Sequence, residues 1–256
     1  AAPMNGALSR TLRAAAGGLD CLLGLVLPRA CPACGAAEPA ADGLCGPCGR
    51  RLLEMVSLPY CPRCGGTLGP HVRAAEEGCR QCPPAPPRFL RVVRLGPYAS
   101  PLRDLLRRWK YRRLDALRGR LARLLAEAAA ARCADSPPDV VVPVPMHWRR
   151  RLARGTDHAR ALARSVAAAM RLPAGDELVR VRHTPPQWDL SRSQRVANVR
   201  GAFAARRSAA LAGAKVLLVD DVSTTGATAN EAARALLETH PDVDAITAAL
   251  AALLGA

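Results

Sequence analysis

The residues best suited to chemistry lie in one short stretch, residues 215–229, which reads KVLLVDDVSTTGATA. Its apolar run, Val216–Val219, is rich in β-branched residues and has the length of a buried strand. This strand is expected to stop at two adjacent carboxylates, Asp220 and Asp221, and a polar turn follows, made of Ser223, Thr224, Thr225, Gly226 and Thr228. Ala227 begins an alanine-rich segment of good helix formers. The stretch therefore predicts a strand, a polar turn and a helix in direct succession.

This succession suits a phosphorylated sugar. Amides at the start of a helix, together with inward-turned hydroxyls, form a donor site for phosphate, and a glycine lets the backbone approach closely. Asp220 and Asp221 can accept hydrogen bonds from vicinal hydroxyls or hold Mg²⁺. Strand, acidic pair, Thr-Thr-Gly and helix together resemble the phosphoribosyl diphosphate (PRPP) signature of type I phosphoribosyltransferases. The alternative is that these residues only end a strand and cap a helix, as Asp, Ser and Thr commonly do.

Eight of the ten cysteines form four Cys-x-x-Cys pairs, which are Cys31 and Cys34, Cys45 and Cys48, Cys61 and Cys64, and Cys79 and Cys82. Each pair can offer two thiolates to a tetrahedral ion, so the four pairs predict two structural zinc ions. Consecutive pairing is the simplest, because each half then closes as its own ribbon, and interleaved pairing stays open. A disulfide framework would need a secreted protein, and a thioredoxin-like redox site would need a surrounding βαβ pattern.

Composition narrows the class of partner. The chain has 37 basic and 21 acidic residues among 256, a net charge of +16, and half of its residues are hydrophobic. It can therefore bury a substantial core, and its charge favours anionic partners, either phosphate-bearing small molecules or nucleic acid. No targeting segment is convincing and no apolar run is long enough to span a bilayer. We therefore expect a cytoplasmic protein.

A proline-rich segment, Pro83–Pro87, is the clearest domain boundary in the sequence. With this boundary we expect an amphipathic helix over residues 1–27, a double zinc ribbon over 28–84 and a larger domain over 88–256. Apolar, β-rich runs alternate with helical patterns in the larger domain, so we expect an α/β fold with a parallel sheet wrapped on both faces.

Two further segments are expected to serve the site. Pro145 ends a β-rich run, and Arg149, Arg150 and Arg151 follow it, where arginines at the carboxyl end of a parallel strand can hold a diphosphate. The polar segment 182–203, which carries Arg192 and Arg195, is expected to act as a lid. The alternatives are solvated arginines at a helix end and a surface loop. The helix predicted after Ser100 has an apolar stripe of Leu102, Leu105, Leu106 and Trp109. Its basic face, which includes Lys110, is either solvated or a surface for nucleic acid or protein.

Four Cys-x-x-Cys pairs ahead of such a domain resemble the ComF family of competence proteins, which joins a double zinc ribbon to a type I phosphoribosyltransferase domain. The resemblance covers nearly the whole chain from about Leu19 onward. Besides the Asp220-Asp221 signature, the matching positions are Val140 to Pro145, Arg149 to Arg151, Arg154-Gly155, Thr184, Gln187, Leu190, Arg195, Asn198 and Gly201-Ala202-Phe203. The chain departs from the family after Gly155, where Thr156-Asp157-His158 replaces an aromatic residue followed by Asn-Gln.

The resemblance implies a binding mode for PRPP. The 5-phosphate would lie at Ser223 to Thr228, the ribose hydroxyls on Asp220 and Asp221, and the diphosphate with magnesium near Pro145 to Arg151. Two classes of function follow. The first is a phosphoribosyltransferase for an unidentified nitrogenous acceptor, linked to DNA uptake. The second is a competence factor that keeps the pocket but works without catalysis, by binding single-stranded DNA or proteins of the competence machinery.

Overall fold

The computed structural model describes residues 30–37, 44–69, 72, 78–80, 82–83, 85–112, 115–185, 190–223 and 225–253. The helix predicted over residues 1–27 and the signature residue Thr224 lie outside this described part. The chain divides into two compact units, residues 1–52 and 53–256, and each is considered by itself. Helix α2 (Gly46–Ser57) runs across the division.

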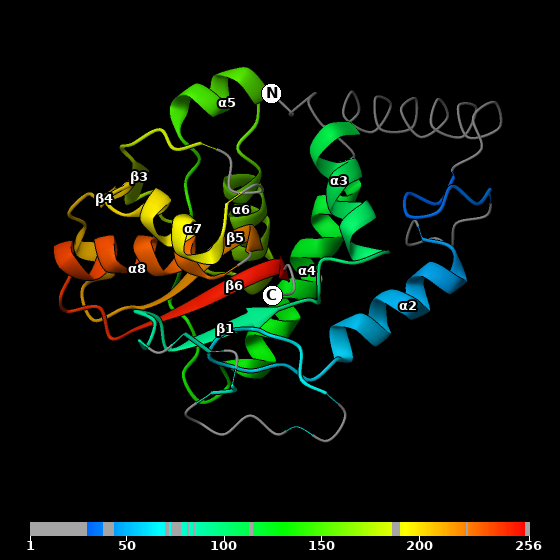
Figure 1. Ribbon diagram of the computed structural model, residues 1–256, viewed down its shortest axis with the longest axis horizontal. Helices are drawn as coiled ribbons and strands as arrows, with labels where there is room; N and C mark the ends of the chain where they lie inside the picture. Colours follow the sequence, from blue (N-terminus) through cyan, green and yellow to red (C-terminus); the bar gives the residue numbers. More distant parts are fainter. Residues whose placement is uncertain are drawn as a thin grey trace, which may run out of the picture. The chain divides into compact units, whose positions relative to one another are not determined.

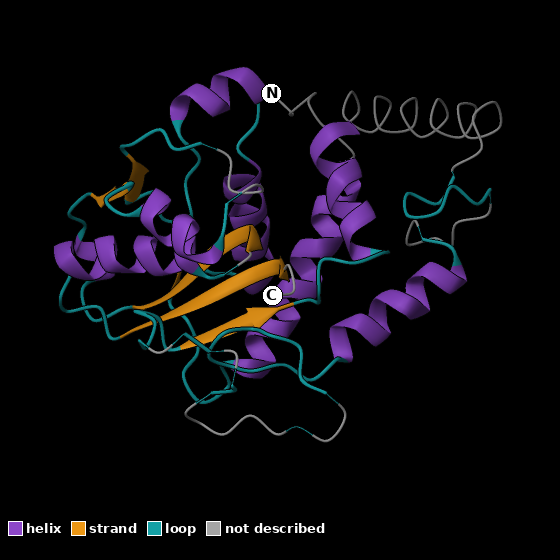
Figure 2. Ribbon diagram, in the orientation of Figure 1, coloured by secondary structure: helices purple, strands orange, loops and turns teal. Residues whose placement is uncertain are grey.

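A four-stranded parallel sheet forms the centre of the larger unit, as the sequence predicts (Figures 1 and 2). Its order is β1 (Arg91–Arg94), β6 (Ala245–Leu253), β5 (Lys215–Ser223) and β2 (Val140–Pro143). Val219 of β5 is in register with Pro143 on one side and with Ala249 on the other. β5 and β2 point the same way, so their carboxyl ends meet at one edge of the sheet.

Helices cover both faces of this sheet. Because side chains alternate along a strand, the even-numbered residues of the strands form one face, and Val142, Val216 and Leu218 pack there with the apolar side of α8 (Ala227–Thr239). Helices α4 (Asp115–Arg132) and α6 (His158–Met170) pack together against the other face. The strands are buried on both sides, which explains their continuous apolar runs.

A second, two-stranded sheet lies outside the parallel one. β3 (Leu178–Arg180) pairs antiparallel with β4 (Phe203–Ala205) and does not join the main sheet. Between these strands the expected irregular segment contains helix α7 (Arg192–Val199). A capping box begins α7, in which the side chains of Ser191 and Gln194 each accept a hydrogen bond from the other residue's backbone N–H. A short 3₁₀ turn, η1 (Ala209–Leu211), precedes β5.

Two more helices follow the first two strands. α3 (Leu102–Arg112) follows β1 and buries Leu102, Leu105, Leu106 and Trp109, the stripe predicted from the sequence. α5 (Trp148–Arg154) follows β2, in the segment predicted as an arginine loop. None of the helices in the described ranges is long and apolar enough to cross a membrane.

Candidate functional site

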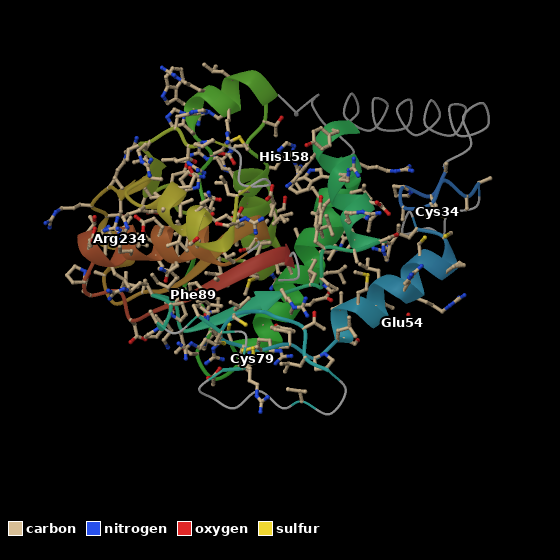
Figure 3. All side chains as sticks on the ribbon, viewed as in Figure 1. Cys34, Glu54, Cys79, Phe89, His158 and Arg234 are labelled. Carbon is tan, nitrogen blue, oxygen red and sulfur yellow. The ribbon has the colours of Figure 1, made fainter. Side chains whose placement is uncertain are left out.

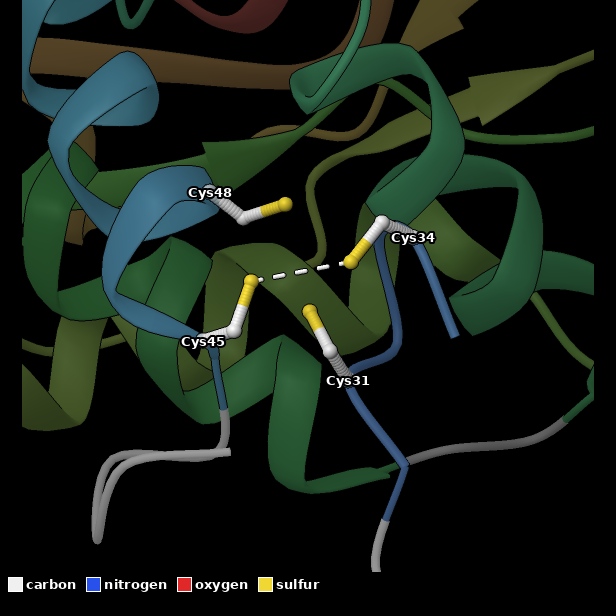
Figure 4. A group of neighbouring side chains, drawn as sticks. All are labelled: Cys31, Cys34, Cys45 and Cys48. Carbon is white, nitrogen blue, oxygen red and sulfur yellow. Dashed lines mark hydrogen bonds between the residues drawn. The ribbon is translucent and has the colours of Figure 1, made fainter. Parts of the chain in front are cut away.

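The eight paired cysteines gather into two groups of four, in consecutive order. The sulfur atoms of Cys31, Cys34, Cys45 and Cys48 all lie within 4.8 Å of one another, and so do those of Cys61, Cys64, Cys79 and Cys82. Figure 4 shows the four side chains of the first group pointing toward a common centre. The structure thus selects consecutive pairing over interleaved pairing.

The distances between sulfurs fit a bound metal and not disulfides. Cys34 and Cys45 are 3.6 Å apart, as are Cys61 and Cys82 and also Cys64 and Cys79. Four thiolates at about 2.3 Å from a tetrahedral zinc ion lie close to this separation, whereas a disulfide brings two sulfurs to about 2.05 Å. Every described cysteine is a free thiol. The two groups therefore fit structural zinc ribbons.

The thiols also show why the groups favour a cation. Burial opposes the charged form of Cys31, but amides of Cys45, Cys34 and Ala33 stabilise it and lower its pKa to about 6. Burial raises the pKa of Cys64, and the nearby sulfurs of Cys79 and Cys61 raise it further. Each group thus holds a thiol with a lowered pKa, Cys31 or Cys61, beside one with a raised pKa, Cys48 or Cys64, and a zinc ion would favour the thiolate form of all of them.

The acidic pair lies inside a strand and does not end it. β5 continues through Asp220 and Asp221 to Ser223, and Val222 and Ser223 still pair with β6. The prediction that the strand stops at Asp220 was therefore wrong. The carboxylates accept hydrogen bonds from the chain that follows, Asp220 Oδ1 from Asp221 N at 2.8 Å and Asp221 Oδ1 from Val222 N at 2.6 Å. Ending a strand thus does not account for the two aspartates.

A lysine from helix α3 reaches this pair. Lys110 Nζ lies 2.7 Å from Asp221 Oδ2, and both side chains are less than one-fifth exposed, 18% and 16%. Burial and the neighbouring Asp221 carboxylate raise the pKa of Asp220 to about 7, although Lys110 and Arg180 oppose this. The two carboxylates are therefore unequal, because only Asp221 has a direct cationic partner among the described residues.

The turn after β5 is built for close backbone approach. Gly226 is the residue before α8 and has φ 73°, a left-handed conformation that glycine adopts without strain. The hydroxyl of Ser223 accepts from Gly226 N at 3.1 Å, and that of Thr225 accepts from Ala227 N at 3.4 Å. The N-cap residue of α8 is Gly226 itself, which has no side chain to cap the helix. The hydroxyls thus shape the turn, which only partly matches the simple capping alternative.

The turn after β2 is held by an aspartate. Asp157 caps α6, where its Oδ1 accepts from Arg160 N at 3.1 Å, and its Oδ2 accepts from Met146 N at 3.2 Å. Asp157 stands where the ComF pattern has asparagine, and both residue types cap helices well. The residue type at this position is therefore still one that suits a helix cap.

The predicted arginines are dispersed around α5. Arg149 is exposed and lies over the Trp148 ring, with its guanidinium carbon 5.3 Å from the ring centroid. Arg150 Nη2 donates to the Thr184 carbonyl at 2.8 Å and so ties α5 to the segment expected to be a lid. Arg151 is exposed at the residue level but lines a cavity with Pro145. These residues therefore do not converge on one point.

Two cavities divide the predicted residues between them. One, of about 350 Å³, lies beyond the end of β2 and is lined by Pro145, Arg151 and Arg180, among others. The other, of about 190 Å³, is lined by Thr225, Gly226 and Ala227, by Val196 of α7, by Phe89, and by Arg63 and Cys64 of the second cysteine group. In the second cavity, α7 and the second cysteine group thus lie beside the turn that was predicted to bind phosphate.

The segment 182–203 is fastened at both ends. Arg180 Nη2 donates to Thr184 Oγ1 at 2.5 Å, and Arg182 Nη2 donates to the Asn198 carbonyl at 2.9 Å. At the far end, Gly201 N donates to Glu231 Oε1 of α8 at 2.6 Å. Arg195 is half-buried on α7, while the side chain of Arg192 lies outside the described part. The structure therefore shows this segment folded against α5 and α8.

Sequence reasoning missed two residues of this region. Lys110 was assigned to a basic helix face, yet it turns toward Asp221. Arg180 was not singled out, although it joins Thr184 and lines the cavity beyond β2. A signal existed for Lys110, because the chain contains only two lysines among its 37 basic residues.

Comparison with known proteins agrees with this architecture. The double zinc ribbon domain family matches residues 22–83, and the phosphoribosyl transferase domain family matches residues 116–253. The fold and the two cysteine groups thus define a protein with a phosphoribosyltransferase domain and a double zinc ribbon. Comparison with individual proteins identifies the family more closely.

Competence protein F of Haemophilus influenzae is 32% identical over 202 residues, which cover 77% of this chain and 85% of that protein. DNA utilization protein YhgH of Salmonella typhi is 34% identical over 199 residues, 76% of this chain and 84% of that protein. The chain therefore belongs to the ComF family, as its sequence patterns indicate. Among solved structures, the allosteric regulatory enzyme of purine biosynthesis matches with TM-score 0.35 and 24% identity, over 52% of this chain and 25% of that one.

Proposed function

We propose that this protein binds PRPP with Mg²⁺ at the carboxyl edge of its parallel sheet and serves DNA uptake as a ComF-type phosphoribosyltransferase. The observation that supports it most is the half-buried acidic pair on β5, followed directly by the Gly226 turn and α8. Related proteins named for competence and for DNA utilization support the biological role. We further propose a cytoplasmic location, and competence proteins as partners.

The residues at this edge have chemistry that fits the ligand. Ser223 to Thr228 would hold the 5-phosphate at the start of α8, where backbone amides and the helix dipole favour an anion. Asp220 and Asp221 would accept from the ribose hydroxyls. Carboxylate oxygens also suit Mg²⁺, which would neutralise charge on the diphosphate when bound. Asp220 is the better ligand for a cation, since its one described hydrogen bond, from Asp221 N, occupies only one of its two oxygens.

The leaving diphosphate would lie toward Pro145 and the arginines of α5. Displacement at the anomeric carbon passes through an oxocarbenium-like state, so catalysis consists of positioning the two reactants, stabilising the leaving group and excluding water. Arg180 and Arg151, which line the cavity beyond β2, are placed to supply positive charge. The 182–203 segment, with Arg192 and Arg195, would exclude water.

Thermal denaturation with and without PRPP and Mg²⁺ tests the pocket. The ligand should raise the melting temperature of the wild type and leave that of an Asp220→Asn, Asp221→Asn double variant unchanged, because a ligand stabilises only the state that binds it. Asp244→Asn is the matched control, since Asp244 is an exposed carboxylate just before β6, at the opposite edge of the sheet. Equal shifts in the wild type and the double variant would refute the assignment. Release of diphosphate across a panel of bases and amines then decides whether turnover occurs.

The surface of α3 favours a second function, binding of single-stranded DNA without catalysis. Tyr111 is 73% exposed and Arg107, one helical turn earlier, is also exposed. An aromatic platform beside arginines is a common feature of single-strand binders. Tyr111→Ala should weaken binding of a labelled single-stranded oligonucleotide, and wild-type affinity should fall steeply with salt. Affinity that is insensitive to both changes would exclude this role for α3.

A further inference from the structure

Lys110 lies on α3, where Arg103 and Arg107 are exposed, but its own side chain is only 18% exposed. Its partner, Asp221, lies on β5, more than 100 residues further along the chain. Among the ion pairs of the described residues, this is the one in which both side chains are less than one-fifth exposed. Burying two charges is costly, and a well-packed apolar pair often serves stability equally well. The pair therefore calls for an explanation other than stability.

The neighbouring residue fixes where Lys110 can reach. Trp109 is buried, and its ring meets the ring of His158 edge to face, with 5.2 Å between centroids and 86° between planes. His158 is the first residue of α6 and is labelled in Figure 3. The preceding residue, Asp157, holds the turn after β2 through Met146 N. Helix α3 is thus anchored between the β2 turn and the acidic pair of β5.

The ion pair makes the acidic pair asymmetric. Lys110 neutralises Asp221 at 2.7 Å, while the described contacts of Asp220 include no ion pair. Without Lys110 the site would carry one more unit of negative charge. At separations of a few ångströms, one unit of charge in a half-buried site changes the affinity for an ion strongly. That extra charge would attract cations and repel an anionic substrate.

We propose that Lys110 is a positioning residue that holds the Asp221 carboxylate and leaves Asp220 as the carboxylate that meets a divalent cation. The identity of the anion it favours rests on the proposed function, PRPP binding. The division of labour between the two carboxylates does not, because it follows from the ion pair itself. The same ion pair sets the charge that an incoming sugar diphosphate meets.

Lys110→Gln tests this division, because the amide keeps a donor for Asp221 and removes the charge. In the zinc-loaded, full-length protein, Mn²⁺ alone should bind about tenfold more tightly to Lys110→Gln than to the wild type, whereas PRPP at fixed Mg²⁺ should bind about tenfold more weakly. Lys110→Arg should restore both affinities toward the wild type. Lys215→Gln, the other lysine of the chain, should change neither.

Opposite signs for the two ligands identify a charge effect, since general damage to the fold weakens both. Equal Mn²⁺ affinity in Lys110→Gln and the wild type, or no detectable Mn²⁺ binding by Lys110→Gln, overturns the proposal. If the wild type binds no PRPP, the proposed function fails, and the Mn²⁺ measurement still decides the role of Lys110. If Lys110→Gln does not fold, the comparison passes to Lys110→Met under the same criteria.

Discussion

Arg94 Nη2 donates a hydrogen bond to Thr67 Oγ1 at 2.8 Å, although Arg94 is only 1% exposed. Thr67 lies between the third and fourth Cys-x-x-Cys pairs, and Arg94 ends β1, so the bond joins the second cysteine group to the parallel sheet. The guanidinium also lies 4.9 Å from the centroid of the Tyr60 ring. Burial lowers the pKa of Arg94 to about 10.

Thr67→Val should therefore destabilise the larger unit. Among the described residues, Arg94 Nε and Nη1 have no hydrogen-bond partner, so loss of Thr67 Oγ1 would leave the buried guanidinium without its one described hydrogen bond. We expect a loss of about 1–3 kcal/mol in the free energy of unfolding, measured by urea denaturation. Thr67→Ser keeps the hydroxyl and should lose much less. A Thr67→Val protein as stable as the wild type would show that the hydrogen bond does not contribute.

Metal content should follow the two cysteine groups. Purified wild type should contain about two zinc ions per chain, since each group offers four thiolates. Cys61→Ser should lower the content to about one ion and reduce the melting temperature. Cys133→Ser is the matched control, because Cys133 is a buried thiol outside both groups, 3.9 Å from Thr247 Oγ1. A zinc content that falls equally in both variants would contradict the grouping.

Gly226 should not tolerate a side chain, and the reason is its backbone. Alanine in the left-handed region costs roughly 1–2 kcal/mol, and the φ of Gly226 is 73°. Gly226→Ala should lower the free energy of unfolding by about this amount and should also weaken ligand binding at the turn. Gly119→Ala is the control with the opposite sign, because Gly119 lies within α4 with room for a methyl group. There alanine should stabilise the protein by about 0.5–1 kcal/mol.

His147 should make stability depend on pH below neutrality. Burial lowers the pKa of its ring, and the charges of His183, Arg180, Arg149 and Arg150 lower it further. The folded state thus binds this proton less readily than the unfolded state, whose histidine pKa is about 6.5. The stability contributed by neutral His147 is fully present above that pKa and is lost as the pH falls through the folded value.

A variant isolates this effect. His147 Nδ1 accepts from Arg149 N at the start of α5, and asparagine keeps such an acceptor without titrating. Between pH 7.5 and pH 5.5, urea denaturation should therefore show a smaller loss of stability in His147→Asn than in the wild type. Parallel pH curves for the two proteins would show that other groups cause the dependence.

Much of the architecture follows from local sequence signals. The Cys-x-x-Cys spacing is set by ligand geometry, so the grouping of thiols was within reach, and the apolar run before Asp220 marks a buried parallel strand. The strand end was wrong because β6 continues to pair with Val222 and Ser223, and no local signal reports a partner strand. Helix α7 had a visible signal, Ser191 and Gln194 at capping-box spacing, which Pro185-Pro186 obscured.

The site itself depends on contacts that local patterns do not encode. Helical periodicity places Lys110 on the border of the buried stripe of α3, and only the ion pair with Asp221 on β5 shows that it turns inward. Arg150 was expected to face a ligand, but its Nη2 donates to the carbonyl of Thr184. The two residues are far apart in the sequence, and no local pattern predicts that they meet. Roles that need two distant segments to meet therefore stay beyond sequence patterns.

β1 is an edge strand of the parallel sheet, and the second cysteine group covers it. Val92 N donates to the Pro62 carbonyl at 2.6 Å, on the side of β1 that faces away from β6. A bare strand edge is a template for pairing with other chains. Loss of zinc would therefore affect more than the ribbon itself, because it would expose the unpaired backbone edge of β1. Removal of zinc from this protein should therefore cause aggregation, and the second cysteine group would help to keep the protein soluble.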